Sequence, residues 1–180
     1  MPKKLDFITP TLMRVFELFL SDPMHEYHER EVVRKTRVSK GSANRLLRVL
    51  AGLGFLNRER KGRMVFYKLN AGQTVVRQFK VLTNVFALKE LTDSIKEHSK
   101  RVVLFGSSAQ GTDTRDSDID LFVLTLAKSL VRGIIGDFNR SSERQIVPII
   151  VNASEFVKLK REDRPLYENV ERGIVLWEKE

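Results

Sequence analysis

The sequence predicts an α+β protein of two domains, and three observations carry this prediction. A length of 180 residues with 42% hydrophobic content is enough for two small packed cores. The first half has helical apolar spacing followed by two strand-like runs, whereas the second half alternates short apolar strands with helices. Charge divides the chain in the same way, since residues 1–100 contain 20 Lys/Arg against 10 Asp/Glu and residues 101–180 contain 12 against 13. The positive excess of the first half indicates a polyanionic partner.

Residues 1–70 are expected to form three helices followed by a β-hairpin. The segments with an apolar stripe at helical spacing are 10–21, 28–36 and 40–53. Pro10 suits an early helical position, Ser39 is a good N-cap for the third helix, and Gly54 suits its C-terminal stop. Two strand-like runs flank a tip that contains Gly62 and predict the hairpin. This order of elements is that of a winged helix-turn-helix.

The outer face of the third helix carries side chains that suit DNA, and in this fold that helix enters the major groove. Arg45 and Arg48 can reach guanine edges or phosphates, and Asn44 can pair with adenine. Lys40 and Ser42 suit the phosphate backbone. The hairpin tip adds cations that would lie along phosphates or a minor groove, which are Arg58, Arg60, Lys61 and Arg63. Double-stranded DNA is the expected partner, although such a fold is also used for protein contacts.

A family resemblance supports this interpretation. The segments VSKGSANRLLRVL at 38–50 and LGFL at 53–56 resemble winged-helix transcription regulators of the MarR/ArsR type. The resemblance covers about residues 8–70, and because its motif is degenerate it implies the fold rather than any particular operator. Regulators of this kind often bind paired half-sites, so a homodimer is expected.

Residues 71–99 are expected to be a helical linker, which leaves residues 100–180 as the second domain. The apolar positions expected to form its stripe are Val75, Val76, Phe79, Leu82, Val85 and Phe86. Leu91 and Ile95 are expected to belong to this helix or to a second segment after Leu88. Because such a stripe must be buried against something, this linker is also where a dimer seam is expected.

The second domain is expected to be a small mixed α/β fold. Its strand-like segments are 102–105, 119–124, 146–151 and 174–177, and its helical segments are 128–139, 154–160 and 165–172. Gly106 and Ser107 follow the first strand as a turn, where exposed backbone N–H groups and a hydroxyl can bind phosphate oxygens. Asp118 and Asp120 are two apart on a predicted strand, so that both carboxylates face the same side and can chelate Mg²⁺.

Jointly these pieces resemble the signature of the DNA polymerase beta nucleotidyltransferase superfamily, most closely its minimal members. The segment that carries the resemblance is VVLFGSSAQGTDTRDSDIDL at 102–121, in which ten residues separate Gly-Ser from Asp-x-Asp. The resemblance covers roughly residues 100–178. It implies a small mixed sheet, an NTP held by Gly106 and Ser107, and Mg²⁺ held by Asp118 and Asp120, which would be catalytic in an active enzyme.

One departure from that family concerns a third carboxylate, which the family places on the following strand to help activate the attacking hydroxyl. Val147 occupies that position here. Glu143 shares its strand parity but would lie about 13 Å away at about 3.3 Å per residue. Two aspartates can still bind a metal–nucleotide, whereas deprotonation of an acceptor would be impaired.

Composition excludes several classes of function. The chain has no cysteine, which rules out disulfides, thiolate zinc sites and cysteine nucleophiles. No apolar run approaches the ~20 residues of a membrane span, and the N-terminus lacks the apolar core of a signal peptide. A cytoplasmic protein without a membrane partner is expected.

Three functions remain open. The favoured one is a DNA-binding, transcription-regulator-like protein whose second domain binds a Mg–nucleotide. The second is an active nucleotidyltransferase that transfers NMP from an NTP to a protein or nucleic-acid acceptor. The third is a scaffold whose winged helix contacts protein.

Overall fold

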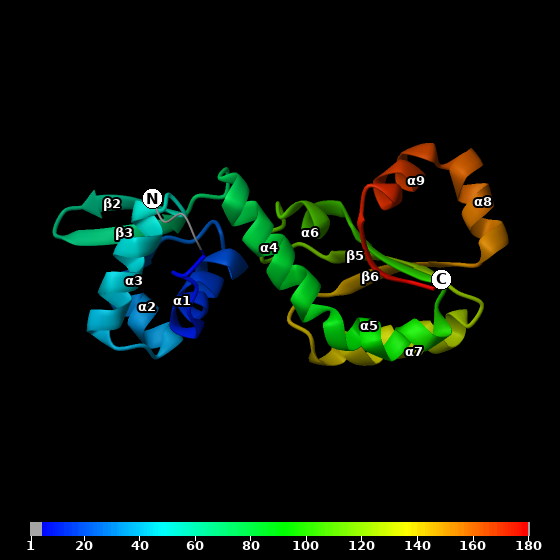
Figure 1. Cartoon of the computed structure of the whole chain (residues 1–180), viewed down its shortest axis with the longest axis horizontal. Helices are drawn as coiled ribbons and strands as arrows, with labels where there is room; N and C mark the ends of the chain where they lie inside the picture. Colours follow the sequence, from blue (N-terminus) through cyan, green and yellow to red (C-terminus); the bar gives the residue numbers. More distant parts are fainter. Residues whose placement is uncertain (1–4, 180) are drawn as a thin grey trace. The chain divides into compact units, whose positions relative to one another are not determined.

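The computed structural model describes residues 5–179 and contains two compact units (Figure 1). The division falls between Phe79 and Lys80, within one helix. Both units combine helices with a β-sheet, so the predicted two-domain α+β class is confirmed. No helix in the described part of the chain combines the length and apolar character needed to cross a membrane.

The first unit packs three helices against a small antiparallel sheet. The helices are α1 (Pro10–Ser21), α2 (Glu29–Thr36) and α3 (Lys40–Gly52), and the strands are β1 (Tyr27–His28), β2 (Leu56–Lys61) and β3 (Met64–Leu69). The sheet order is β1-β3-β2. Strand β1 was not predicted, because two residues carry no periodicity and extend only through their pairing with Tyr67 and Phe66.

Local signals explain the ends of these helices. Thr9 caps α1 by accepting a hydrogen bond from the Leu12 N–H, and Ser39 caps α3 by accepting one from Ser42 N–H, each at 3.2 Å. Gly54 follows α3 with φ +74°, a left-handed conformation that suits glycine, and thereby turns the chain into β2. The buried side chains that fill this core include Phe16, Phe19, Leu47, Leu50 and Phe55.

Helix α4 (Thr74–Ala87) and helix α5 (Lys89–Ile95) follow, and α5 ends in the 3₁₀ turn η1 (Lys96–His98). Val76 and Phe79 belong to the first core, whereas Leu88, Leu91 and Ile95 belong to the second. Three apolar side chains of the stripe expected on this segment are exposed on α4, namely Val75, Leu82 and Phe86. The face of α4 that packs inward also holds polar residues, among them the buried Lys80.

The second unit is a four-stranded sheet with helices on both faces. Its elements are β4 (Arg101–Phe105), α6 (Gly106–Gln110), β5 (Ile119–Leu124), α7 (Lys128–Ser141), β6 (Ile146–Val151), α8 (Ala153–Glu162), α9 (Arg164–Glu171) and β7 (Ile174–Glu178). The order is β6-β5-β4-β7, in which only β5 and β6 are parallel. Figure 1 shows α5 and α7 on one face and α8 and α9 on the other, in agreement with two apolar clusters on opposite faces of β4 and β5.

Successive side chains of β5 point to opposite faces of the sheet, so they pack alternately against α5 and α7 or against α8 and α9. Leu121 and Val123 lie in the cluster with α5 and α7, whereas Phe122 lies in the cluster with α8 and α9. Asp120 therefore has the parity of the α8–α9 face. On β6 the same face receives Ile149, which gives Val147 that parity too.

Candidate nucleotide and metal site

Gly106 and Asp120 lie in contact at the end of two neighbouring strands. Asp120 is the register partner of Phe105, the last residue of β4, so its carboxylate reaches the backbone of the next residue. Gly106 has φ +68°, and a Cβ added there would overlap the Oδ2 atom of Asp120. Glycine is thus required twice at this position, for its backbone conformation and for the space that the carboxylate occupies.

The Gly-Ser segment begins a helix rather than forming the simple turn that the sequence predicts. Helix α6 starts at Gly106 and ends at Gln110, where Gly111 adopts φ +66°. The first N–H groups of any helix have no partner in their own helix and favour anionic ligands. Ser107 is half-buried and Ser108 is completely buried, so Ser107 is the hydroxyl of the pair that a ligand can reach.

Asp118 and Asp120 lie close enough for their charges to interact, but only Asp120 belongs to a strand. Strand β5 begins at Ile119, and Asp118 precedes it as an exposed loop residue, which corrects the prediction that both lie on the strand. Burial raises the pKa of the half-buried Asp120 carboxyl, and the charge of Asp118 raises it further. Because the repulsion disfavours two bare carboxylates, a cation at this place would relieve it.

Val147 lies directly beside Asp120. The parallel register of β5 and β6 pairs the Cα atoms of these two residues, and Val147 is 47% exposed. Glu143 is exposed and precedes the strand, in the segment between α7 and β6. Within residues 5–179 there is no group of three or more His, Asp or Glu side chains placed to hold a metal ion. The arrangement therefore offers two carboxylates, with an apolar side chain next to them.

A family model described as nucleotidyltransferase domain matches residues 88–176. This half of the chain is a nucleotidyltransferase-type domain. The matched region contains Gly106, Ser107, Asp118 and Asp120, which are the residues that the sequence motif identified. Domains of this type bind or transfer nucleotides. No curated protein matches the chain.

Three solved structures are similar to this chain at low identity. The first is a provisionally assigned nucleotidyltransferase from Sulfolobus solfataricus, with 18% identity and a TM-score of 0.40, covering 60% of this chain and 92% of its own. The second is an IclR family transcriptional regulator from Brucella abortus, with 16% identity and a TM-score of 0.35, covering 90% and 62%. The third is TrmBL2, an archaeal chromatin protein with a novel mode of DNA binding, with 12% identity and a TM-score of 0.34, covering 92% and 71%.

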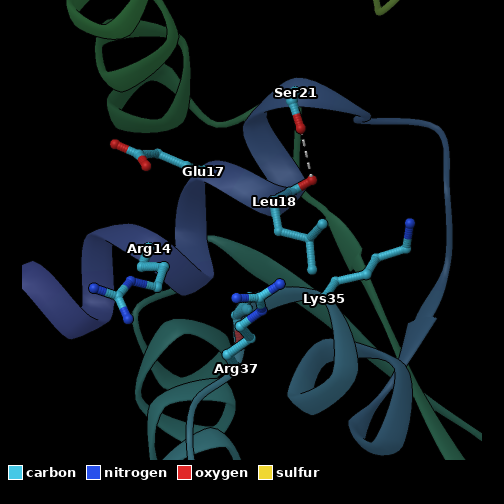
Figure 2. A pocket seen from close by; sticks show the side chains of 7 residues that line it. Arg14, Glu17, Leu18, Ser21, Lys35 and Arg37 are labelled. Atoms are coloured by element: carbon cyan, nitrogen blue, oxygen red, sulfur yellow. Dashed lines mark hydrogen bonds between the residues drawn. The ribbon is translucent and has the colours of Figure 1, made fainter.

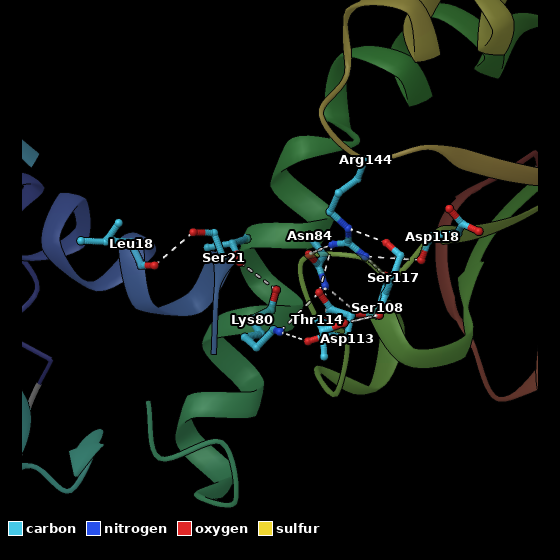
Figure 3. A network of polar contacts seen from close by, with 11 residues as sticks. Leu18, Ser21, Lys80, Asn84, Ser108, Asp113, Thr114, Ser117, Asp118 and Arg144 are labelled. Carbon is cyan, nitrogen blue, oxygen red and sulfur yellow. Dashed lines mark hydrogen bonds and ion pairs between the residues drawn. The ribbon is translucent and has the colours of Figure 1, made fainter. Parts of the chain in front are cut away.

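A cluster of polar side chains lies beside the loop of the nucleotidyltransferase-type domain that leads to Asp118 (Figure 3). We call it the Arg144 cluster, and its members are Lys80, Asn84, Ser108, Asp113 and Arg144. Lys80 and Asp113 are almost completely buried. Burial lowers the pKa of Lys80, and the adjacent Asp113 carboxylate partly offsets this.

Sequence reasoning missed this cluster because its members are far apart in the chain. One signal was available, since Lys80 and Asn84 are four residues apart and share a helix face with apolar neighbours. A polar pair on an inward helical face needs partners.

The residues predicted to bind DNA lie on α3 and in the β2–β3 hairpin. They differ in whether their side chains already have hydrogen-bond or ion-pair partners. Lys40, Arg45, Arg48, Arg58 and Arg63 are exposed, with no side-chain hydrogen bond or ion pair anywhere in residues 5–179. The remaining four have partners, which are Ser39 for Ser42, Glu29 for Asn44, the Gly62 carbonyl for Arg60, and Glu26 for Lys61. Asn44 donates from Nδ2 to Glu29 Oε2 at 2.5 Å.

A groove between α1 and the end of α2 carries further cations (Figure 2). Arg14, Lys35 and Arg37 line it together with one carboxylate, Glu17. None of the three cations forms an ion pair in the described part of the chain. The positive surface of the first unit thus extends beyond the residues that sequence analysis selected.

Proposed function

We propose that this protein is a DNA-binding, transcription-regulator-like protein whose nucleotidyltransferase-type domain binds a Mg–nucleotide. The observation that carries the proposal is the contact between Gly106 and Asp120, with Asp118 beside it and Val147 in place of a third carboxylate. Nucleotide binding needs the first three of these residues. Transfer needs in addition a group that takes the proton of the acceptor, and Val147 has none.

The residues present fit a magnesium-bound nucleotide. Mg²⁺ is commonly held in proteins by one or two carboxylates together with substrate phosphates, and Asp118 and Asp120 supply that number. The raised pKa of Asp120 reflects an arrangement that a divalent cation would stabilise. Gly106 and Ser107 at the start of α6 would hold phosphate oxygens through backbone N–H groups and a hydroxyl. When bound, the metal would neutralise triphosphate charge and orient it.

Calorimetry with the Mg²⁺ complexes of ATP, GTP, CTP and UTP tests nucleotide binding directly. The wild type is expected to bind at least one of them, and the variant carrying Asp118→Asn with Asp120→Asn is expected to bind none. Asp116→Asn is the matched control, since Asp116 is an exposed aspartate of the same loop without an ion pair in residues 5–179. A wild type that ignores all four nucleotides would contradict the proposal.

The proposed partner of the first unit is double-stranded DNA, with α3 in the major groove and the β2–β3 tip along the phosphates. Support comes from Arg45 and Arg48, which are exposed and unpaired on α3 within residues 5–179. Replacing both with Ala should weaken binding and reduce the slope of log affinity against log salt by about 0.9 for each phosphate that the variant no longer neutralises. Arg132→Ala, an exposed arginine of α7, should leave the slope unchanged. If the Arg45/Arg48 variant and the Arg132 variant had equal salt slopes, the first unit would more readily be a module that contacts protein.

We also propose that two copies associate through α4. Val75, Leu82 and Phe86 are exposed apolar residues of one helix, and Phe86 is 76% exposed. Exposed apolar surface of this kind marks interaction sites, and a dimer would suit paired half-sites on DNA. Light scattering of the wild type should give twice the chain mass, and Leu82→Glu with Phe86→Glu should give the single chain mass. A monomeric wild type would contradict this part of the proposal.

Active nucleotidyl transfer is the second candidate function. The observation that favours it is the exposure of Asp118, which leaves the carboxylate pair open to an acceptor from solvent. Incubation with labelled NTPs, Mg²⁺ and cell lysate tests it. Label transfer that disappears in the variant with both aspartates changed to Asn would support transfer, and binding without transfer would leave the regulator proposal in place.

A further inference from the structure

The guanidinium group of Arg144 contacts the two segments that form the candidate site. Its Nε donates to the Ser117 carbonyl at 2.9 Å, and its Nη2 lies 3.4 Å from the Asp118 carbonyl. The same Nη2 donates to Ser108 Oγ at 2.8 Å. Figure 3 shows Arg144 reaching both Ser117 and Ser108 from the segment that precedes β6.

These contacts matter because the segment 112–118 has no regular secondary structure of its own. Asp118 lies just before the strand, where the β5–β6 ladder begins with the bond from Ile119 N–H to the Gln145 carbonyl. Hydrogen bonds between Thr114 and Ser117 hold the turn in this segment, and Arg144 donates to the carbonyls of residues 117 and 118. On the other side, Ser108 belongs to α6, whose first residues are Gly106 and Ser107.

Arg144 is itself held in place by the buried Asp113 and the half-buried Asn84. Its Nη1 donates to Asp113 Oδ2 at 3.0 Å and to Asn84 Oδ1 at 3.2 Å. Asp113 is buried, and Lys80 Nζ lies 3.4 Å from the same carboxylate oxygen. If this side chain swung away, the buried Ser108 hydroxyl and the half-buried Asn84 carbonyl oxygen would lose the donor that Arg144 supplies.

We propose that Arg144 is a positioning residue that fixes the Asp118 backbone against the start of α6, and so sets the geometry in which a Mg–nucleotide binds. This inference rests on the proposed nucleotide binding. It does not require Arg144 to touch the ligand. This role depends on the geometry of the guanidinium group, whereas attraction of a triphosphate depends only on its charge. A lysine at this position keeps the charge but cannot reproduce the planar fork of a guanidinium.

The experiment compares Arg144→Lys and Arg144→Gln with the wild type and with Arg140→Gln. Arg140 is an exposed arginine of α7 whose partner is Asp137 of the same helix, so its removal controls for charge. Two quantities are measured on the full chain. Calorimetry gives the affinity for Mg–ATP, GTP, CTP and UTP, and hydrogen exchange gives the protection of backbone amides in residues 106–120 and in α7.

Both Arg144 variants should lose roughly tenfold or more in nucleotide affinity, which corresponds to about 1.4 kcal/mol. Both should also exchange faster in residues 106–120 while α7 keeps its protection, and the Arg140 variant should match the wild type. Wild-type affinity in the lysine variant would overturn the positioning role and leave only a charge effect. Unchanged exchange in residues 106–120 would overturn it as well.

The two readouts keep this inference separate from the proposed function. If the wild type binds none of the four nucleotides, the proposed function fails, and the exchange comparison still decides whether Arg144 orders the loop. If the wild type binds and both Arg144 variants bind equally well, only the positioning role fails. If one of the two Arg144 variants unfolds, the comparison is made with the other, since Lys and Gln differ in charge and length.

Discussion

Asp120 and Val147 are direct neighbours across the parallel strands β5 and β6, and their side chains share one face of the sheet. A carboxylate placed at residue 147 would therefore join the pair formed by Asp118 and Asp120. Val147→Asp should tighten divalent-cation binding by roughly fivefold or more, because attraction between unit charges at 4 Å is worth about 1 kcal/mol even in water. Val147 is 47% exposed, so the substitution should cost little stability.

Titration with Mg²⁺ and with Mn²⁺ measures this effect. The matched control is Val175→Asp, since Val175 is a valine of β7 with a similar exposure of 43%. If transfer is limited by the missing carboxylate, the Val147 variant should also gain label transfer in the labelled-NTP assay. Equal cation affinity in the two variants would show that position 147 does not contribute to the site.

The raised pKa of Asp120 makes a prediction about stability and pH. A proton binds this carboxyl more tightly in the folded chain than in the unfolded chain, so Asp120 contributes stability below its usual pKa of 3.8 that is lost as pH rises through the raised value. Asp120→Asn removes this dependence on pH. The variant should unfold at a higher temperature than the wild type near neutral pH in the absence of divalent cations, and the difference should vanish in acid.

Thermal unfolding from acid to neutral pH checks this sign, with Asp116→Asn as the control that removes one charge from the loop before β5. Metal affinity should rise with pH, in contrast to the stability contribution of Asp120, because the cation requires the deprotonated carboxylate. A wild type that unfolds at a higher temperature than the Asp120 variant at neutral pH without metal would contradict the prediction.

Gly106 should tolerate no side chain. Gly106→Ala forces a non-glycine residue into a left-handed conformation, at a cost of roughly 1–2 kcal/mol, and pushes its Cβ into the Asp120 carboxylate. Nucleotide binding should be lost together with stability. Gly133→Ala is the control, because Gly133 lies in α7 with open space around it and its replacement should stabilise the chain by about 0.5–1 kcal/mol.

Denaturant unfolding and calorimetry on the same samples check both effects. Nucleotide affinity equal to that of the wild type in the Gly106 variant would mean that the start of α6 is not part of the binding site.

Much of this site could be predicted from the sequence because its signals are local. Gly106, Asp118 and Asp120 lie within fifteen residues of each other. Val147 was identified by the family resemblance, and the register of β5 and β6 places it beside Asp120. The signals at Pro10 and Ser39 are also local, and they mark where α1 and α3 begin.

The Arg144 cluster could not be predicted in this way, since it joins residues up to 60 positions apart, such as Asn84 and Arg144. Apolar spacing also does not show what an apolar stripe is buried against. On α4 it marked Leu82 and Phe86 as part of one stripe, whereas Lys80 and Asn84 occupy the inward face through ion pairs and hydrogen bonds that only the fold creates.

Glu29 should act against DNA binding through Asn44. The Glu29 carboxylate accepts the Nδ2 hydrogen of Asn44, which is the donor that Asn44 would need to pair with an adenine. The same carboxylate places a negative charge beside the outer face of α3. Glu29→Gln removes that charge, and Glu29→Ala also frees the amide, so both should tighten DNA binding several-fold at low salt, with the gain shrinking as salt screens the charge.

Anisotropy titrations of labelled genomic fragments at several salt concentrations measure the gain. Glu31→Gln is the matched control, because Glu31 lies in the same first turn of α2 and pairs with His25 rather than with α3. Both glutamates support the helix dipole equally, so a difference between them isolates the contact with Asn44. Equal affinities for the Glu29 and Glu31 variants would mean that Asn44 does not contact the bases.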